Sequence, residues 1–462
     1  MTERTRKKGK NNFMFLYKFA KFNRRKLNIF SIFLLFLAFS FIFSSCQKLN
    51  KESESQNFQI EKVEEIEKTS EQEKEIDLEK IKKQKQNEAI KNFVATLSDE
   101  QLIAQLFVLG IDGKDSIPSY VKTEFANASP GAFLLFSSNI TNNAQDLCNF
   151  TSSVFNWFAE QNLIVPLFLI DNEGGDVYRL KEIASPLPSA KNIAQSFKIE
   201  KAQNYYALIA KQMRALGLHV NLAPLVEVQN NSNIAFLGSR TFGDAENVQN
   251  YAAAAVNGFK SEKIAAVLKH FPGNTNIDPH ASLPHLSVDS QVFQNQYIAP
   301  FEYLMQFKPE MVLMSHIVVD CVEKTPACFS SIMINNILRD KLGFEGIVIS
   351  DDLYMAALAE NGFPIEIAVI QAVNAGVNLL MLSEKHFGKS FDVLIEEFKQ
   401  NEEFASKIKA SVERIIKLKI ELGLLTFDEN EMKISLGEKL NAEKMFNDFS
   451  LAKKEALDFL TK

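Results

Sequence analysis

The feature that most limits the possible folds is a series of eight short apolar runs separated by amphipathic stretches. The runs cover residues 105–110, 131–136, 165–170, 219–226, 265–269, 311–316, 346–350 and 377–382. The stretches between them, such as 202–216, 246–260, 332–341 and 364–375, repeat apolar residues at helical spacing. Short apolar runs of this kind are typical of parallel strands buried on both faces. A doubly wound open sheet would give a similar pattern. Eight runs, with no glycine-rich phosphate loop after the first, favour a closed (β/α)8 barrel of the TIM type.

Polar residues gather where successive runs end. The third run is followed by Asp171, Glu173 and Arg179, the fourth by Glu227 and Arg240, the fifth by His270, Asp278 and His280, the sixth ends at Ser315 and His316, and the seventh leads into Asp351 and Asp352. In a parallel barrel the carboxyl ends of all strands lie on one rim, where barrel enzymes hold their catalytic groups. Any one of these residues could be a helix cap or part of an ion pair. Together they predict an active site on that rim.

The first 45 residues have the composition of an export signal. Ten Lys and Arg against one Glu precede an apolar run over residues 29–43, which leads into Ser44-Ser45-Cys46. A basic segment, an apolar segment of this length and small residues describe a signal peptide, and the run is shorter than the ~20 residues that a membrane-spanning helix needs. Cys46 resembles the lipidated cysteine of bacterial lipoproteins. We therefore expect a lipid anchor at Cys46 that holds the protein in the cell envelope, outside the cytoplasm. An uncleaved signal anchor is the alternative.

The rest of the chain divides into three parts. Residues 46–90 are rich in Glu, Lys and Gln and predict a tether, disordered or helical, with a coiled-coil partner helix as the alternative. The barrel is expected over residues 91–426, with Ser98 capping its first helix, and a C-terminal helical extension over residues 427–462. Residues 1–45 carry ten positive charges and one negative charge, so the remainder carries −15 where the whole chain carries −6. That acidic balance argues against a nucleic-acid partner.

The other three cysteines, Cys148, Cys321 and Cys328, show no metal-binding spacing. A Cys321–Cys328 disulfide is one reading, but free buried thiols fit better. Neither a metal nor an organic cofactor is expected.

Four motifs, taken in order, resemble glycoside hydrolase family 3, and more narrowly its β-N-acetylglucosaminidase branch. They are IDNEGG at 170–175, KHFPG at 269–273, DPHASLP at 278–284 and GFEGIVISDDL at 343–353. The resemblance runs from about residue 91 to about residue 425. It implies a carbohydrate substrate.

The resemblance also implies a retaining mechanism with a covalent glycosyl-aspartate intermediate. Asp351 would be the nucleophile, and Asp352 would have a supporting role. His280 would be the general acid and base, oriented by Asp278 as in a catalytic triad. His285 is the competing candidate, although we expect it to face solvent.

Substrate binding is implied for residues whose donors and acceptors suit dense sugar hydroxyls. These residues are Asp171, Arg179, Arg240, Lys269 and His270. For Arg179 and Arg240 a salt bridge at the barrel rim is the alternative, and His316 could either line the pocket or belong to the core.

The chain departs from the family pattern in three places. Gly273-Asn274-Thr275 stands where the family usually has Gly-His-Gly-Asp-Thr, which shortens the loop by two residues. Pro279 replaces a frequent serine, and Asp176 stands where a basic residue is common. These differences bear on substrate preference and rate more than on the class of reaction.

The predicted function is an exo-acting β-N-acetylhexosaminidase that removes terminal β-linked GlcNAc from peptidoglycan fragments or other glycans. One alternative is a phosphorylase that uses phosphate as the acceptor. Another is a sugar-binding lipoprotein without turnover. A β-glucosidase is disfavoured by the Asp278-Pro279-His280 unit.

Overall fold

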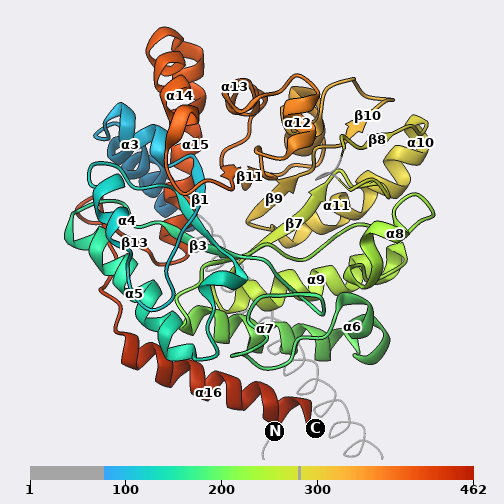
Figure 1. The fold of residues 1–462 in the computed structure, drawn as a ribbon, viewed down its shortest axis with the longest axis horizontal. Coiled ribbons are helices and arrows are strands. Elements are labelled where there is room, and N and C mark those ends of the chain that lie inside the picture. The colour runs from blue at the N-terminus through green and yellow to red at the C-terminus, as the bar shows by residue number, and fades with distance from the viewer. Residues whose placement is uncertain (1–77, 279–281, 462) are drawn as a thin grey trace, which may run out of the picture. The chain divides into compact units, whose positions relative to one another are not determined.

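The computed structural model describes residues 78–278 and 282–461, and its centre is a barrel of eight parallel strands (Figure 1). In chain order the strands are β1 (Phe107–Gly110), β2 (Ala132–Leu135), β3 (Leu167–Ile170), β6 (Val220–Asn221), β7 (Ala265–Phe271), β9 (Met311–Met314), β11 (Ile347–Ser350) and β12 (Leu380–Leu382). They follow the same order around the sheet. A parallel bridge between Ile349 and Leu379 joins β11 to the chain just before β12 and closes the ring. The predicted (β/α)8 barrel is confirmed.

Apolar sequence on both faces of each strand explains the barrel. All residues of β2 and β3 are buried, and the rings of Phe133 and Phe168 on these neighbouring strands lie 6.2 Å apart. Because helices cover the outer face and side chains fill the interior, neither face can be polar. The strand β6 is shorter than its predicted run. Pro224 has no amide hydrogen for the ladder, and pairing resumes at Leu225, which bridges to Lys269 of β7.

Helices surround the barrel (Figure 1). The longer ones are α5 (Ala144–Glu160), α7 (Ile199–Ala215), α9 (Ala245–Ser261), the π-helical η6 (Ile332–Lys341), α13 (Ile365–Ala375), α14 (Gly388–Gln400) and α15 (Glu402–Glu421). The shorter ones are α3 (Asp99–Ala104), α4 (Ser119–Glu124), η1 (Ser137–Asn139), α6 (Ala190–Ser196), α8 (Ile234–Leu237), η2 (Gly238–Arg240), α10 (Ser290–Val292), η3 (Phe293–Ile298), α11 (Ala299–Leu304), η4 (Met305–Phe307), η5 (Ala327–Phe329) and α12 (Ala356–Glu360). The predicted cap at Ser98 is confirmed, because its hydroxyl accepts a hydrogen bond from the Gln101 amide.

Three short strand pairs complete the fold. The strands β4 (Asn172–Gly174) and β5 (Val177–Tyr178) form an antiparallel pair directly after β3, and β8 (His285–Leu286) pairs with β10 (Val318–Val319). Near the C-terminus, β13 (Leu425–Asp428) and β14 (Lys433–Leu436) form an antiparallel hairpin. Residue 427, where a helical extension was expected to begin, therefore lies within a strand.

The last helix, α16 (Ala442–Leu460), lies along the outside of the barrel against α5 and α7 (Figure 1). Its buried face consists of Met445, Phe449, Ala452 and Ala456. Lys211 of α7 forms an ion pair of 2.7 Å with Glu455. At the other end of the described chain a helix covers residues 78–94, and its Ala89 and Ile90 are buried in the hydrophobic core. The barrel's packing thus includes residues before position 91.

The predicted signal over residues 1–45 and the predicted lipidation site Cys46 lie outside the described residues. Across 78–278 and 282–461, no helix is both long enough and apolar enough to cross a membrane. The cysteines in these ranges are free thiols, of which Cys148 and Cys328 are buried and Cys321 is half-buried.

One lysine is fully buried in the barrel wall. Lys419 of α15 has no exposed surface, and its Nζ donates a hydrogen bond of 2.7 Å to the side-chain oxygen of Gln105. Burial lowers the pKa of Lys419 well below the ordinary value of a lysine. The unfolded chain therefore holds one more proton at this position than the folded chain, over the pH range between the two pKa values.

Replacing Lys419 with methionine tests this burial. Folding releases the proton of Lys419, because its folded pKa is depressed. Raising the pH towards the unfolded value of 10.5 removes the cost of that release. The free energy of unfolding of the wild type should therefore rise relative to that of the variant by up to ~1.4 kcal/mol per pH unit. Urea unfolding at pH 7, 8 and 9 measures this slope. Lys409→Met, at an exposed position of the same helix, is the control. Parallel pH profiles for wild type and Lys419→Met would contradict the prediction.

Candidate active site

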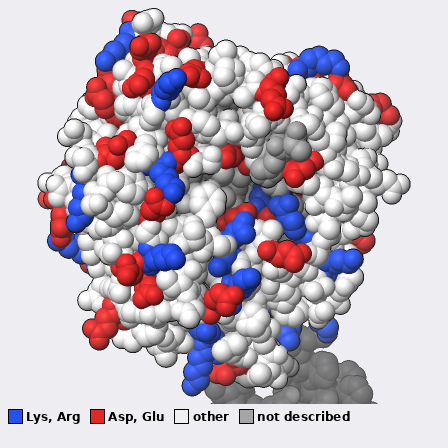
Figure 2. All heavy atoms as spheres, viewed as in Figure 1, with Lys and Arg blue, Asp and Glu red and all other residues white. Residues whose placement is uncertain are grey.

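A cavity of about 330 Å³ opens at the carboxyl ends of the barrel strands. The described residues that line it are Leu134, Leu135, Phe136, Asp171, Val177, Arg179, Leu222, Phe236, Arg240, Lys269, His270, Asn274, Leu313, Asp351, Asp352, Met355, Met381, Leu382 and Ser383. Figure 2 shows basic and acidic side chains next to one another in the hollow at the middle of this face. All five residues predicted to bind substrate, together with Asp351, are thus brought to one cavity.

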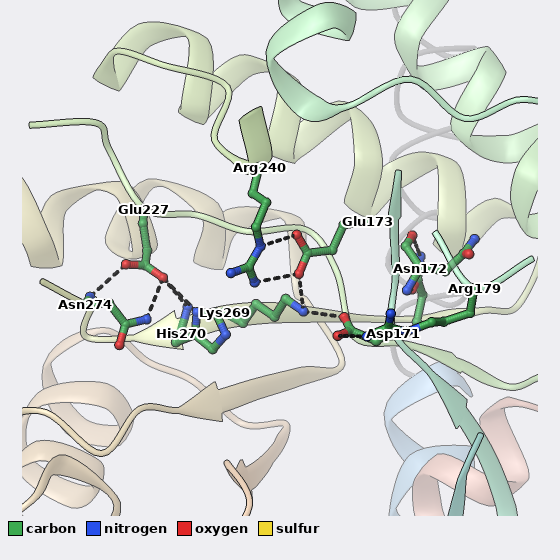
Figure 3. A network of polar contacts seen from close by, with 10 residues as sticks. Asp171, Asn172, Glu173, Arg179, Glu227, Arg240, Lys269, His270 and Asn274 are labelled. Atoms are coloured by element: carbon green, nitrogen blue, oxygen red, sulfur yellow. Dashed lines mark hydrogen bonds and ion pairs between the residues drawn. The ribbon is translucent and has the colours of Figure 1, made fainter. Parts of the chain in front are cut away.

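The floor of this cavity carries a chain of alternating charges (Figure 3). The Lys269 ammonium lies 2.5 Å from a carboxylate oxygen of Asp171 and 2.5 Å from one of Glu173. The Arg240 guanidinium donates two hydrogen bonds of 2.8 Å to the two oxygens of Glu173. Arg179 lies 3.8 Å from the other oxygen of Asp171. The two arginines therefore line the cavity and form ion pairs at the same time. The salt-bridge alternative is observed, and their role in binding substrate stays a prediction.

The burial of this network fixes its ionisation. The side chains of Glu173 and Lys269 are 4% and 3% exposed. Burial alone would raise the pKa of Glu173, but the Lys269 ammonium and the Arg240 guanidinium outweigh it and hold that pKa at about 2. Burial would likewise lower the pKa of Lys269, but the carboxylates of Asp171 and Glu173 raise it. Glu173 and Lys269 are therefore both charged at neutral pH, and the network offers donors and an acceptor to hydroxyl groups.

A second buried carboxylate, Glu227, contacts His270 and Asn274. Glu227 follows β6, and its side chain is 1% exposed. It lies 2.7 Å from Nδ1 of His270 and accepts hydrogen bonds from both the backbone and the side-chain amide of Asn274 (Figure 3). His270 and Asn274 both line the cavity.

Asp351 and Asp352 follow β11 and differ in what they contact. One oxygen of Asp352 accepts hydrogen bonds from the backbone amides of Tyr354 and Ser383, so this carboxylate holds the ends of β11 and β12 together. Burial raises the pKa of Asp352. Asp351 accepts a hydrogen bond from the backbone amide of Asp352 at 2.9 Å. This arrangement fits the supporting role expected of Asp352 and leaves Asp351 as the candidate nucleophile.

His316 belongs to the core beneath the site. It is 1% exposed and does not line the cavity. Its Nε2 lies 3.0 Å from the backbone carbonyl of Asp352, and its Nδ1 lies 3.2 Å from Sγ of Cys328. Burial lowers the pKa of His316 and raises that of Cys328. The neutral imidazole therefore donates from Nε2 to the carbonyl and accepts from the thiol at Nδ1, which braces the backbone beside Asp351.

The predicted acid/base loop is described only in part. Asp278 is exposed in the loop after β7 and is not among the residues that line the cavity. His280 lies outside the described residues. His285 is exposed, 3.6 Å from Asp320, and does not line the cavity.

Three contributors to the site were assigned no specific role from the sequence: Glu173, Glu227 and Asn274. Glu173 and Glu227 follow β3 and β6, so the strand-end rule that found Asp171 pointed to them as well. Across residues 78–278 and 282–461, no group of three or more His, Cys, Asp or Glu side chains could hold a metal ion.

The description "Glycosyl hydrolase family 3 N terminal domain" matches residues 98–418. The chain belongs to this family. The resemblance seen in the four motifs is confirmed.

Several relatives of this family-3 chain are named as hexosaminidases or acetylglucosaminidases. Beta-hexosaminidase A of Pseudoalteromonas piscicida is 28% identical over 323 residues, which cover 63% of this chain and 53% of that protein. The beta-hexosaminidase of Nitrosospira multiformis is 28% identical over 60% of this chain and 79% of its own length. A solved family-3 beta-N-acetylglucosaminidase from Paenibacillus sp. str. FPU-7 superimposes with a TM-score of 0.67 at 26% identity and covers 78% of this chain and 69% of that one. The chain thus spans about half the length of the first relative.

Proposed function

We propose that this family-3 protein is a retaining, exo-acting β-N-acetylhexosaminidase. It would remove terminal β-linked GlcNAc from peptidoglycan fragments or other glycans. The observation that carries the proposal is that Asp351 lines the same cavity as the charged network of Asp171, Lys269 and Arg240. The names of the relatives, beta-hexosaminidase and beta-N-acetylglucosaminidase, support it.

In this mechanism Asp351 attacks the anomeric carbon and forms a glycosyl-aspartate bond as the leaving group departs. The general acid that protonates the leaving oxygen is His280, with Asp278 fixing its orientation. Water, deprotonated by the same histidine, then attacks the anomeric carbon and releases the sugar with its original configuration.

The size of the cavity favours removal of one terminal sugar at a time. A volume of about 330 Å³ is at the lower end for small-molecule pockets, which suits one sugar unit rather than a polymer. Lys269 and Arg240 provide donors, and Asp171 provides an acceptor, for the hydroxyls of that unit. We also propose that the lipid anchor at Cys46 keeps the enzyme in the cell envelope, where peptidoglycan fragments occur.

The direct test is hydrolysis of p-nitrophenyl β-GlcNAc and of the matching β-glucoside by the full-length protein, with and without phosphate. We expect nitrophenol release from the GlcNAc compound alone, at a rate independent of phosphate, because a hydrolase uses water as the acceptor. A phosphate-dependent rate with a sugar-phosphate product would identify a phosphorylase instead. Binding of GlcNAc without release from either compound would identify a sugar-binding protein.

A further inference from the structure

The carboxylate of Glu227 is placed to control two residues of the cavity without entering it. It is almost completely buried and does not line the cavity. Its oxygens instead contact Nδ1 of His270, the backbone amide of Asn274 and the side-chain amide of Asn274, at 2.7, 2.7 and 3.0 Å. The carboxylate oxygens accept hydrogen bonds from both amides of Asn274 and from the backbone amide of His270. They act as acceptors there, so Nδ1 of His270 must present a proton to them.

This requirement fixes the orientation of both neighbours. His270 must carry a proton on Nδ1, which in the neutral ring makes Nε2 an acceptor. Asn274 must turn its NH2 towards Glu227, so its side-chain oxygen points the other way, as Figure 3 shows. His270 and Asn274 both line the cavity. Glu227 thereby determines which atom of each of these cavity-lining residues is left as an acceptor, Nε2 of His270 and Oδ1 of Asn274.

The same carboxylate holds the root of the loop that carries Asp278. Its hydrogen bond to the Asn274 backbone lies four residues before Asp278. Two residues after Asn274, the Asn276 side chain accepts from the Ala235 amide and donates to the Asn231 carbonyl. Gly273 lies between the root and the barrel, and its backbone has a φ of +142°. A Cβ at this position would come within 2.8 Å of the Tyr297 ring, so a larger residue does not fit there. The loop therefore leaves the barrel along a path that is tied to the β6–α8 connection.

We propose that Glu227 is a positioning residue for substrate binding. It sets the Nδ1-protonated tautomer of His270 and the amide orientation of Asn274, and it anchors the root of the loop after β7. The inference rests on the proposed glycosidase function for its kinetic consequence, but its structural part, the tautomer, is independent of turnover.

Glu227→Gln is the informative substitution because it keeps shape and volume. The glutamine side chain keeps one acceptor oxygen and has an NH2 group in place of the other. That NH2 faces either the backbone amide of Asn274, which is itself a donor, or Nδ1 of His270. In the second case the histidine must move its proton to Nε2 and present a donor to the sugar. Either way a buried polar contact is lost, and we expect kcat/KM on p-nitrophenyl β-GlcNAc to fall about 10- to 100-fold, mostly through KM. Glu227→Asp, which keeps the charge, should recover part of this loss.

Glu310→Gln is the matched control. Glu310 is also a buried carboxylate, but it accepts from the Ala266 amide at the start of β7, where that strand enters the barrel. A folded Glu310→Gln should keep wild-type kcat/KM. An equal loss in both variants, or a Glu227→Gln within two-fold of wild type, would overturn the proposal.

A second measurement separates this inference from the proposed function. In wild-type protein labelled with 15N-histidine, ring 1H–15N spectra, with the His270 signal assigned from its absence in His270→Gln, report the tautomer directly. A proton on Nδ1 that shifts to Nε2 in Glu227→Gln supports the proposal. A wild-type His270 protonated only on Nε2 overturns it. If wild type releases no nitrophenol while the tautomer is as expected, the proposed function fails and the positioning role of Glu227 stands.

Discussion

Replacing Asp351 with asparagine is expected to lower kcat on p-nitrophenyl β-GlcNAc by at least about 10³-fold while the barrel stays folded. Asparagine has the shape of aspartate, and its oxygen can still accept the hydrogen bond from the Asp352 amide. It cannot form the glycosyl ester or stabilise the positive charge that develops at the anomeric carbon. The loss should appear in kcat rather than in substrate binding, because the bond to the anomeric carbon is absent from the bound substrate and begins to form in the transition state.

Azide gives this prediction a sharper readout. In Asp351→Ala the carboxylate is gone and its space is open, so a small anion can enter there and attack the anomeric carbon from the side that Asp351 faces. The expected product is an α-glycosyl azide, with restored nitrophenol release. The control is Asp352→Asn, which keeps an oxygen for the amides of Tyr354 and Ser383 and should lose far less activity. If azide instead rescues Asp352→Asn and the Asp351 variant stays active, the two roles are reversed.

Most of the barrel could be predicted because its strands are buried on both faces. Eight apolar runs correspond to eight strands, and the helices predicted at 246–260 and 332–341 match α9 and η6 within one residue at each end. The hairpin β13–β14 was not predicted, although Leu425 to Asp428 alternates between buried and exposed positions in the way a half-buried strand does. Two strands of four residues give too short a pattern to stand out beside a long helix.

The position of the site could be predicted from the sequence, but the ion pairs between its side chains could not. Strand ends place Asp171 and Lys269 on one rim, whatever the details of the packing. That Glu173 lies between Lys269 and Arg240 depends on the direction in which each side chain leaves the backbone, and Arg240 comes from η2, far along the loop after β6. For the same reason His316 could not be assigned. It stands at the end of its run, and that position alone does not show that the ring packs in the core against Cys328.

Replacing Glu173 with glutamine is expected to cost the folded state about 3–5 kcal/mol at pH 7, the usual range for removing one partner of a buried ion pair. The reason is the excess positive charge left behind. Arg240 loses its bidentate partner, and Lys269 keeps only Asp171. The glutamine oxygen can still accept hydrogen bonds on one side, but the NH2 on the other side then faces a cation. Urea unfolding of wild type and variant measures the difference in free energy.

The pH dependence of this difference identifies its cause. Because the folded pKa of Glu173 is about 2, below its ordinary value of 4.5, its contribution is fully present above pH 4.5 and is lost as the pH falls towards 2. The stability gap between wild type and Glu173→Gln should therefore be constant from pH 7 to about 5 and narrow below that. Glu160→Gln, which removes an exposed ion pair with Lys439, should leave stability unchanged across the range, because water and salt screen such pairs. A gap of the same size at pH 3.5 as at pH 7 would show that packing, rather than the charge of Glu173, stabilises the network.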